Sequence, residues 1–207
     1  MYTKSEATIA SILAAAEALF LNQHYADVTM DDIAESAGVT KGALYHHFAN
    51  KEALYAAMML RDLKAKQALF NSAVNSPGTC RERLRRFTQI FLDLPREKRD
   101  LIKLVRRDIN IFNDPLRNRL IRAYQAALPE QAEVIIRDGI CEGELTPPPG
   151  GDARLLSWLH VAMVEVILTR YAESVFRSRD DVADFATRLF FDGAGNPQGH
   201  RDALPTA

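Results

Sequence analysis

The segment from Val28 to Phe48 constrains the fold most, because a glycine separates two short amphipathic helical patterns within it. Thr29 stands where a helix N-cap is expected, and two aspartates follow in the first turn, where the helix dipole favours carboxylates. Gly38 is the residue type that most easily adopts the left-handed conformation found at helix C-termini. Thr40 can then cap a second short helix. We therefore expect two short helices joined by a tight turn.

Two short helices joined in this way form a helix-turn-helix, whose second helix enters the DNA major groove with its N-terminus first. Gly42 and Ala43 are small enough to let that helix lie close to base edges, and Lys41 can reach a guanine or a phosphate. Leu44 and Phe48 lie four residues apart and should face back into the domain. The predicted DNA contacts are Thr29, Thr40, Lys41, Gly42, Ala43, Tyr45, His46, His47 and Lys51.

The run from Ile33 to Phe48 resembles the DNA-binding signature of TetR-type transcriptional regulators, as do Asn50-Lys51-Glu52 after it and Leu19-Phe20, Tyr25 and Val28-Thr29 before it. The match is dense over the first quarter of the chain, and beyond it only the length and helical layout are similar. The resemblance implies an all-α fold, in which an N-terminal three-helix DNA-binding domain precedes a helical ligand-binding and dimerisation domain. It also implies a homodimer, double-stranded operator DNA as partner, a small-molecule effector, and a fourth helix that swings when ligand binds.

Periodicity and capping signals predict about nine helices. These are expected at about 5–22, 30–37, 40–48, 51–74, 79–94, 96–110, 115–142, 152–174 and 181–192. Asp114 is the expected cap of the seventh, with Pro115 at its first position, and Pro129 should kink or divide it. Asn50 can cap the helix at 51–74. Lys51 is there either a phosphate contact or simply one more exposed lysine.

The expected domains are a DNA-binding domain at 1–50, a ligand-binding and dimerisation domain at 51–192 and a disordered tail at 193–207. Helix 51–74 links the first two. Aromatic and methionine side chains of the second domain could line an apolar effector pocket between helices, although aromatic residues at helical spacing are more often simple core. The candidate pocket residues are Phe70, Phe87, Phe91, Phe112, Tyr124, Trp158 and Met163.

The helices at 152–174 and 181–192 have wider apolar faces than one neighbour needs, so they could pair with their copies in a second subunit as a four-helix interface. The residues predicted at this dimer interface are Leu155, Leu159, Met163, Val166, Val182, Phe185 and Leu189.

The charges are distributed unevenly along the chain. Residues 1–50 hold two bases and six acids, which is unusual for a DNA-binding module because cationic side chains usually supply non-specific affinity. Positive potential is expected from Lys51, Arg61, Lys64 and Lys66. Residues 81–122 hold thirteen bases and six acids, which indicates either an anionic ligand or an ordinary solvated face.

Other classes of function are less well supported. Cys80 and Cys141 lack metal-ligand spacing and are either ordinary thiols or a redox-sensing pair, and no metal or cofactor is expected. The chain lacks a Gly-rich phosphate loop, a Gly-x-Ser-x-Gly elbow and a His-Glu-x-x-His motif, so we do not expect an enzyme. No apolar run is long enough to span a membrane, and no leader is apparent, which favours the cytoplasm.

The sequence therefore predicts a ligand-responsive DNA-binding transcriptional regulator, most simply a repressor released from its operator by a small apolar or amphipathic effector. The alternative is a helical interaction protein that keeps the helix-turn-helix fold without reading DNA. The acidic residues at 1–50 are the reason to retain this alternative.

Overall fold

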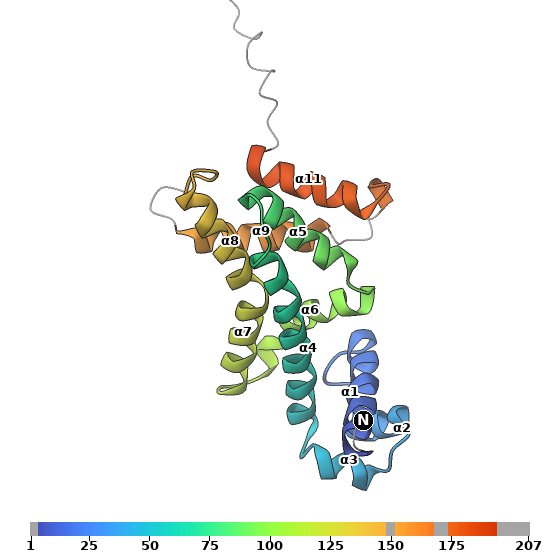
Figure 1. The fold of residues 1–207 in the computed structure, drawn as a ribbon. Coiled ribbons are helices and arrows are strands. Elements are labelled where there is room, and N and C mark those ends of the chain that lie inside the picture. The colour runs from blue at the N-terminus through green and yellow to red at the C-terminus, as the bar shows by residue number, and fades with distance from the viewer. Residues whose placement is uncertain (1–3, 148–151, 168–173, 194–207) are drawn as a thin grey trace, which may run out of the picture. The chain divides into compact units, whose positions relative to one another are not determined.

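A computed structural model describes residues 4–147, 152–167 and 174–193, and within these residues the chain is helical and contains no strand. The colours of Figure 1 follow the helices in chain order. Their bounds are α1 Lys4–Asn22, α2 Met30–Ala37, α3 Lys41–His47, α4 Lys51–Val74, α5 Cys80–Asp93, α6 Arg96–Asp108, the 3₁₀ turn η1 Ile109–Ile111, α7 Leu116–Ala127, α8 Pro129–Cys141, α9 Ala153–Ile167 and α11 Arg179–Asp192. The all-α prediction is confirmed.

Several helix ends lie where the capping signals placed them. Asn50 Oδ1 accepts from the Ala53 N–H at 2.8 Å and so caps α4. The Thr79 N–H donates to Glu82 Oε2 at 2.9 Å, while Thr79 Oγ1 accepts from the Glu82 N–H at 3.2 Å, which completes a capping box before α5. Pro129 begins a new helix, so the expected long helix is divided there rather than kinked.

Three expected helix bounds are wrong. Asp114 does not cap α7: the Asp114–Pro115 peptide is cis, Pro115 itself occupies the N-cap position, and the helix begins at Leu116. α6 ends at Asp108 and continues as a 3₁₀ turn instead of reaching residue 110 as α-helix. α11 begins two residues before Asp181, because the Ser178 hydroxyl accepts from the Asp181 N–H at 3.1 Å and so supplies the cap.

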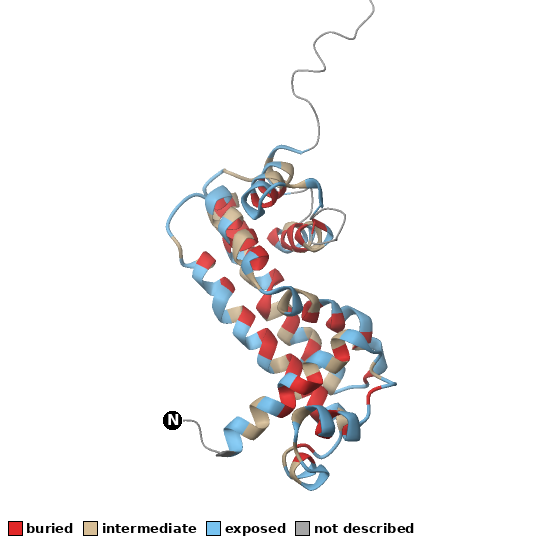
Figure 2. Cartoon of the chain, turned by 90° about the vertical axis from the view of Figure 1, so that its right-hand side faces the viewer, coloured by how far each residue is buried: buried red, intermediate tan, exposed pale blue. Residues whose placement is uncertain are grey.

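The chain contains two compact units, each with its own core. Of the described residues, the first unit comprises 4–71 and 94–131, and the second comprises 72–93 and those from 132 to 193. Figure 2 shows buried residues in red on the helix faces that pack together and exposed residues in pale blue on the outer faces. The predicted boundary at residue 50, between a DNA-binding domain and a ligand-binding domain, does not coincide with either boundary of these units and stays a prediction.

No helix in the described ranges is long and apolar enough to cross a membrane. Three expectations concern residues that lie outside those ranges: the tail after Gly193, the end of the helix expected to reach about residue 174, and the proline-glycine loop at 148–151.

Candidate nucleic-acid interface

The ends of α2 and the start of α3 are fixed by three local capping interactions. Thr29 Oγ1 accepts from the Asp32 N–H at 3.1 Å and donates to Asp32 Oδ2 at 2.7 Å, so Asp32 reaches back over the start of α2. Gly38 has a φ of 66°, and its N–H donates to the carbonyls at the end of α2. The Thr40 hydroxyl accepts from the Ala43 N–H at 3.2 Å and caps α3. The two-helix prediction is therefore confirmed.

The inner side of this motif is fixed by burial and by one contact from α1. Leu44 is fully buried and Phe48 is nearly so, as expected from their spacing, and Ile33 of α2 is also fully buried. Ser11 of α1 donates a hydrogen bond to the carbonyl oxygen of Ala37 at 3.1 Å, at the last residue of α2. The turn that precedes α3 is thus held directly by α1.

The opposite side of α3 is exposed. Thr40, Lys41 and Gly42 are exposed at its N-terminus, which is the end that a recognition helix presents to base edges. Tyr45 is 45% exposed, so its hydroxyl is accessible to a phosphate. These residues, which were predicted to contact DNA, therefore lie on one accessible face, and their individual roles stay predictions.

The other residues predicted to contact DNA differ in how exposed they are. Ala43 is half-buried, so only part of it is accessible from the side of the reading residues. His46 is exposed and His47 half-buried, with their rings 5.1 Å apart and nearly perpendicular. The Thr29 hydroxyl is occupied by the cap of α2, so a phosphate at that position would have to be bound mainly by backbone N–H groups.

Lys41 pairs with Asp31, and their nearest charged atoms are 2.8 Å apart. Hydrogen bonding to Asp31 raises the pKa of the Lys41 ammonium. Both side chains are more than half exposed, so the pair is screened by water and contributes little to stability. Lys41 can therefore exchange Asp31 for a phosphate or a guanine when DNA approaches.

Lys51 has a structural role that the sequence did not indicate. Its ammonium donates to the carbonyls of Tyr25 at 2.6 Å and Val28 at 2.7 Å, with Ala26 at 3.4 Å, and lies 4.4 Å from the centre of the Tyr25 ring. The alternative that it is simply one more exposed lysine is wrong. A phosphate contact through this ammonium would require it to give up carbonyl partners, because an ammonium has three donors.

Gly42 offers a test of close approach to DNA. A Cβ added at this position would have no neighbour within 4 Å in the protein, so the fold itself does not require glycine there. We expect Gly42→Ala to raise the free energy of unfolding by about 0.5–1 kcal/mol, because glycine weakens helices relative to alanine. Operator affinity should fall about tenfold, because the added methyl overpacks a close interface.

Denaturant unfolding and gel shift measure the two effects of Gly42→Ala separately. A variant that is stabilised and still binds operator DNA as well as the parent would show that α3 does not approach the bases at this point.

A polar and aromatic cluster in the first unit joins α6 to α1 and α4. Asp108, which is 2% exposed, accepts from the Tyr55 hydroxyl at 2.9 Å and from Nε and Nη2 of Arg107 at 2.7 and 2.9 Å. Arg107 also donates to the carbonyls of Phe20 at 3.1 Å and Gln23 at 3.3 Å, at the end of α1. The C-terminus of α6 is thereby attached to α1 and α4.

Phe112 belongs to the same cluster. Its ring centre lies 5.1 Å from those of both Tyr25 and Tyr55. Burial raises the pKa of the Tyr55 hydroxyl, with the Asp108 carboxylate as a second cause, so Tyr55 stays protonated as the donor to Asp108. Phe112, predicted to line an effector pocket, is here a core aromatic.

The predicted pocket residues are divided between the two units. Phe70, Phe112 and Tyr124 lie in the first, and the other four lie in the second. Phe70, Phe87 and Phe91 are almost completely buried, as expected of core positions. Pocket lining by this set stays a prediction.

The predicted dimer surface is partly exposed. Leu155, Leu159 and Val166 of α9 are 50%, 54% and 68% exposed, which is unusual for large apolar side chains. Val182 is buried inside its own unit and is accordingly unsuited to contact with a second subunit. Met163, Phe185 and Leu189 are half-buried.

Several bases of the segment at 81–122 pair with acids elsewhere in the chain. In the second unit, Arg81 pairs with Asp192 at 2.5 Å, and Arg85 pairs with Asp184 at 2.5 Å, so α5 packs against an acidic side of α11. These arginines are partly exposed and already paired with acids, which agrees with a solvated face better than with a free anion site. The sequence signal for this pairing was that Asp180, Asp184 and Asp192 lie at multiples of four residues along one helix.

The cysteines do not form a redox pair in this structure. Both are free. Burial raises the pKa of the Cys80 thiol to about 12, and the nearby Glu144 carboxylate adds to the shift. A thiol with so high a pKa is poorly reactive, because the thiolate is the reactive form.

Comparison with known proteins agrees with this geometry. Residues 12–58 match the model of a family described as bacterial regulatory proteins, tetR family. Over these residues the N-terminal segment of this chain is similar to the tetR family. The matched residues run from α1 through the helix-turn-helix into α4, which includes the face formed by Thr40, Lys41 and Gly42.

Two curated relatives match the same end of the chain. The HTH-type transcriptional regulator TtgR of Pseudomonas putida is 39% identical over 99 residues, which are 44% of this chain and 47% of the relative. The HTH-type transcriptional activator FasR of Mycolicibacterium smegmatis is 35% identical over 82 residues, 40% of this chain and 37% of the relative. The chain thus spans less than half the length of these two relatives.

Solved structures are similar in fold over most of the chain. FadR from Bacillus subtilis, in complex with stearoyl-CoA, has a TM-score of 0.74 at 19% identity and covers 90% of this chain and 99% of its own. AibR, in complex with isovaleryl coenzyme A and operator DNA, has a TM-score of 0.74 at 21% identity and covers 89% of this chain and 98% of its own. At these identities the likeness shows the fold alone.

Proposed function

We propose that the protein is a homodimeric, ligand-responsive transcriptional regulator in the cytoplasm, a repressor released from its operator by a small apolar or amphipathic effector. One observation supports this most strongly: Thr40, Lys41 and Gly42 are exposed at the start of a short capped helix, while Leu44 and Phe48 bury its other side. The family match over residues 12–58 supports the same role, and it argues for DNA binding rather than catalysis.

Dimerisation is proposed from the exposed apolar side chains of α9. Leu155, Leu159 and Val166 would be covered by the same surface of a second copy. Two recognition helices would then read half-sites about 34–36 Å apart or at a related spacing. An effector that converts a mostly bound population to a mostly free one must prefer the released state by about 10⁴-fold.

A helical interaction protein without specific DNA reading is the second candidate. Asp31, Asp32 and Glu35 are exposed on α2 beside the recognition helix and would repel phosphates unless paired or engaged in capping. Selection from random duplex DNA followed by gel shift distinguishes the two. Recovery of a two-half-site sequence supports the regulator, and the absence of any sequence-specific shift at low salt supports the interaction protein.

Two substitutions test the roles of individual residues. We expect Lys41→Ala to change the preferred base at one or two operator positions, at a cost of about 1–3 kcal/mol of discrimination, because it contacts base edges. Tyr45→Phe should weaken all sites about equally, because its hydroxyl contacts phosphate. Binding to a library of operator variants measures both effects.

Lys103→Ala is the matched control for Lys41→Ala. Lys103 is an equally exposed lysine in a comparable ion pair, with Asp100 at 2.5 Å, and should leave the base preference unchanged. If Tyr45→Phe altered base preference while Lys41→Ala weakened every site alike, the two roles would be interchanged.

A further inference from the structure

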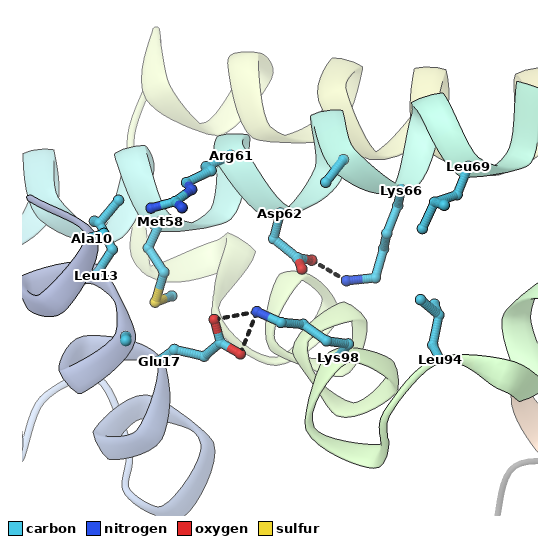
Figure 3. A pocket seen from close by; sticks show the side chains of 12 residues that line it. Ala10, Leu13, Glu17, Met58, Arg61, Asp62, Lys66, Leu69, Leu94 and Lys98 are labelled. Carbon is cyan, nitrogen blue, oxygen red and sulfur yellow. Dashed lines mark hydrogen bonds and ion pairs between the residues drawn. The ribbon is translucent and has the colours of Figure 1, made fainter. Parts of the chain in front are cut away.

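A cavity of about 380 Å³ opens within the first unit, among α1, α4 and the beginning of α6 (Figure 3). This volume lies in the range of about 300–1,000 Å³ that small-molecule sites occupy. Its walls combine an apolar part, to which Leu13, Met58, Leu69 and Leu94 contribute, with five charged side chains. The charged residues are Glu17, Arg61, Asp62, Lys66 and Lys98.

Two of the charged residues are buried on the cavity side of α4. Lys66 is 2% exposed and Asp62 is 8% exposed, and they form an ion pair one helical turn apart. Burial lowers the pKa of the Lys66 ammonium and raises the pKa of the Asp62 carboxyl. A buried ion pair is usually no more stabilising than two apolar side chains of similar size, so stability alone does not explain its presence.

The hydrogen-bonding capacity of Lys66 is only partly used. An ammonium has three N–H donors, and among the described residues Asp62 is the hydrogen-bond partner of Lys66. Figure 3 shows the Lys66 ammonium on the cavity side of α4, directed toward Asp62, with Lys98 and Leu94 across the cavity from α4. A ligand oxygen at this place would supply a missing acceptor.

The charges of the cavity leave one cation unneutralised. Glu17 and Lys98 pair with each other at 2.6–2.7 Å, and Asp62 pairs with Lys66. Arg61, in contrast, is exposed and has neither an ion pair nor a hydrogen bond to any residue that the structure describes. Guanidinium groups bind carboxylates in a bidentate manner, so an anion is the ligand class that this cavity fits.

We propose that this cavity binds an amphipathic carboxylate, whose apolar part lies against Leu13, Met58 and Leu69 and whose carboxylate is bound by Arg61 and Lys66. None of the seven residues predicted to line the effector pocket takes part, so this is a different site. Because the carboxylate adds a negative charge beside a buried ammonium, it competes with Asp62 for Lys66.

The site is placed where occupancy can act on the DNA-binding helices. α1 forms one wall, and its Ser11 hydroxyl holds the end of α2 through the carbonyl of Ala37. A ligand that moves α1 against α4 therefore also moves the turn before α3. This regulatory part of the inference rests on the proposed function.

Decanoate is a suitable probe, because it combines one carboxylate with an apolar chain. Isothermal titration of the full chain should show one decanoate bound per chain. Decan-1-ol, with a similar tail and no charge, and decyltrimethylammonium, with the opposite charge, should bind at least about tenfold more weakly, since a charge-assisted hydrogen bond is lost. Equal binding of all three would overturn the proposal.

Variants locate the binding. Arg61→Gln should weaken decanoate binding about tenfold or more, whereas Lys64→Gln, at an exposed lysine of the same helix that does not line the cavity, should not. Asp62→Leu combined with Lys66→Met replaces the buried pair by apolar side chains, so the protein should stay folded and still lose affinity for decanoate. Unchanged affinity in Arg61→Gln and in the double variant would disprove the site.

Operator binding separates this proposal from the proposed function. Decanoate should change the affinity for the selected operator in the parent protein and not in the double variant. If specific DNA binding is found and decanoate neither binds nor alters it, the site is wrong and the function stands. If decanoate binds as described and no operator is recovered, the function fails and the ligand site stands.

Discussion

Replacing Asp108 by alanine should lower the free energy of unfolding by about 2–4 kcal/mol. The carboxylate is buried and accepts hydrogen bonds from the Tyr55 hydroxyl and the Arg107 guanidinium. Removing one partner of such an arrangement leaves a buried donor and a partly buried charge unsatisfied, which costs far more than the arrangement contributes as a whole. Denaturant unfolding followed by circular dichroism measures the loss.

Asp100→Ala is the matched control for Asp108→Ala. Asp100 lies on the same helix, is partly exposed, and pairs with Lys103 and Arg96 at the surface, so its replacement should cost no more than about 0.5 kcal/mol. Tyr55→Phe should cost about 1 kcal/mol in the parent and much less in the Asp108→Ala background, since the same hydrogen bond is then already lost. Equal losses for Asp108→Ala and Asp100→Ala would mean that the cluster does not stabilise the first unit.

Acidification should destabilise the second unit through His160. This side chain is fully buried in α9, with Nε2 3.4 Å from Thr88 Oγ1 and its ring against Phe87 and Phe190. Its Nδ1 has no hydrogen-bond partner among the described residues. Burial without a charged partner lowers the pKa of the imidazole from 6.5 to about 4.

The direction of the effect follows from proton binding. Between pH 6.5 and about 4 the unfolded chain binds a proton at His160 that the folded chain does not, so stability falls as the pH falls through this window. The loss of unfolding free energy approaches about 3 kcal/mol near pH 4. Above pH 6.5, His160 does not contribute to the pH dependence of stability. Unfolding of the parent and of His160→Leu at a series of pH values measures the difference.

His160→Leu should remove this part of the pH dependence and leave the part that carboxylates contribute. Leucine is similar in size and has no titrating group, so the difference between the two profiles isolates the imidazole. If both proteins lost stability equally between pH 6.5 and 4, His160 would not be the buried base that the structure describes.

Local signals in the sequence were sufficient to predict α2 and α3. Thr29, Gly38 and Thr40 act within three or four residues of the groups that they cap, and such interactions can be read from spacing alone. The same holds for the burial of Leu44 and Phe48, which follows from helical periodicity. The bounds of α4 were predicted correctly for the same reason.

Contacts between distant segments could not be predicted in this way. The hydrogen bond of Tyr55 with Asp108 joins residues 53 positions apart, and Lys51 reaches carbonyls 23 to 26 positions away. Lys66 was expected to add positive potential at the surface, and this is wrong because the structure buries it beside Asp62. On a helix, an acid and a base four residues apart usually indicate an exposed pair.

The α2–α3 motif is secured from outside at two places, by the Ser11 hydroxyl at the end of α2 and by the Lys51 ammonium on the carbonyls that precede it. These contacts hold the backbone before and after α2 in the absence of DNA. If α3 docks on DNA, the motif therefore loses little conformational entropy. The contacts of its few exposed side chains then contribute to affinity and are not offset by the cost of ordering the motif.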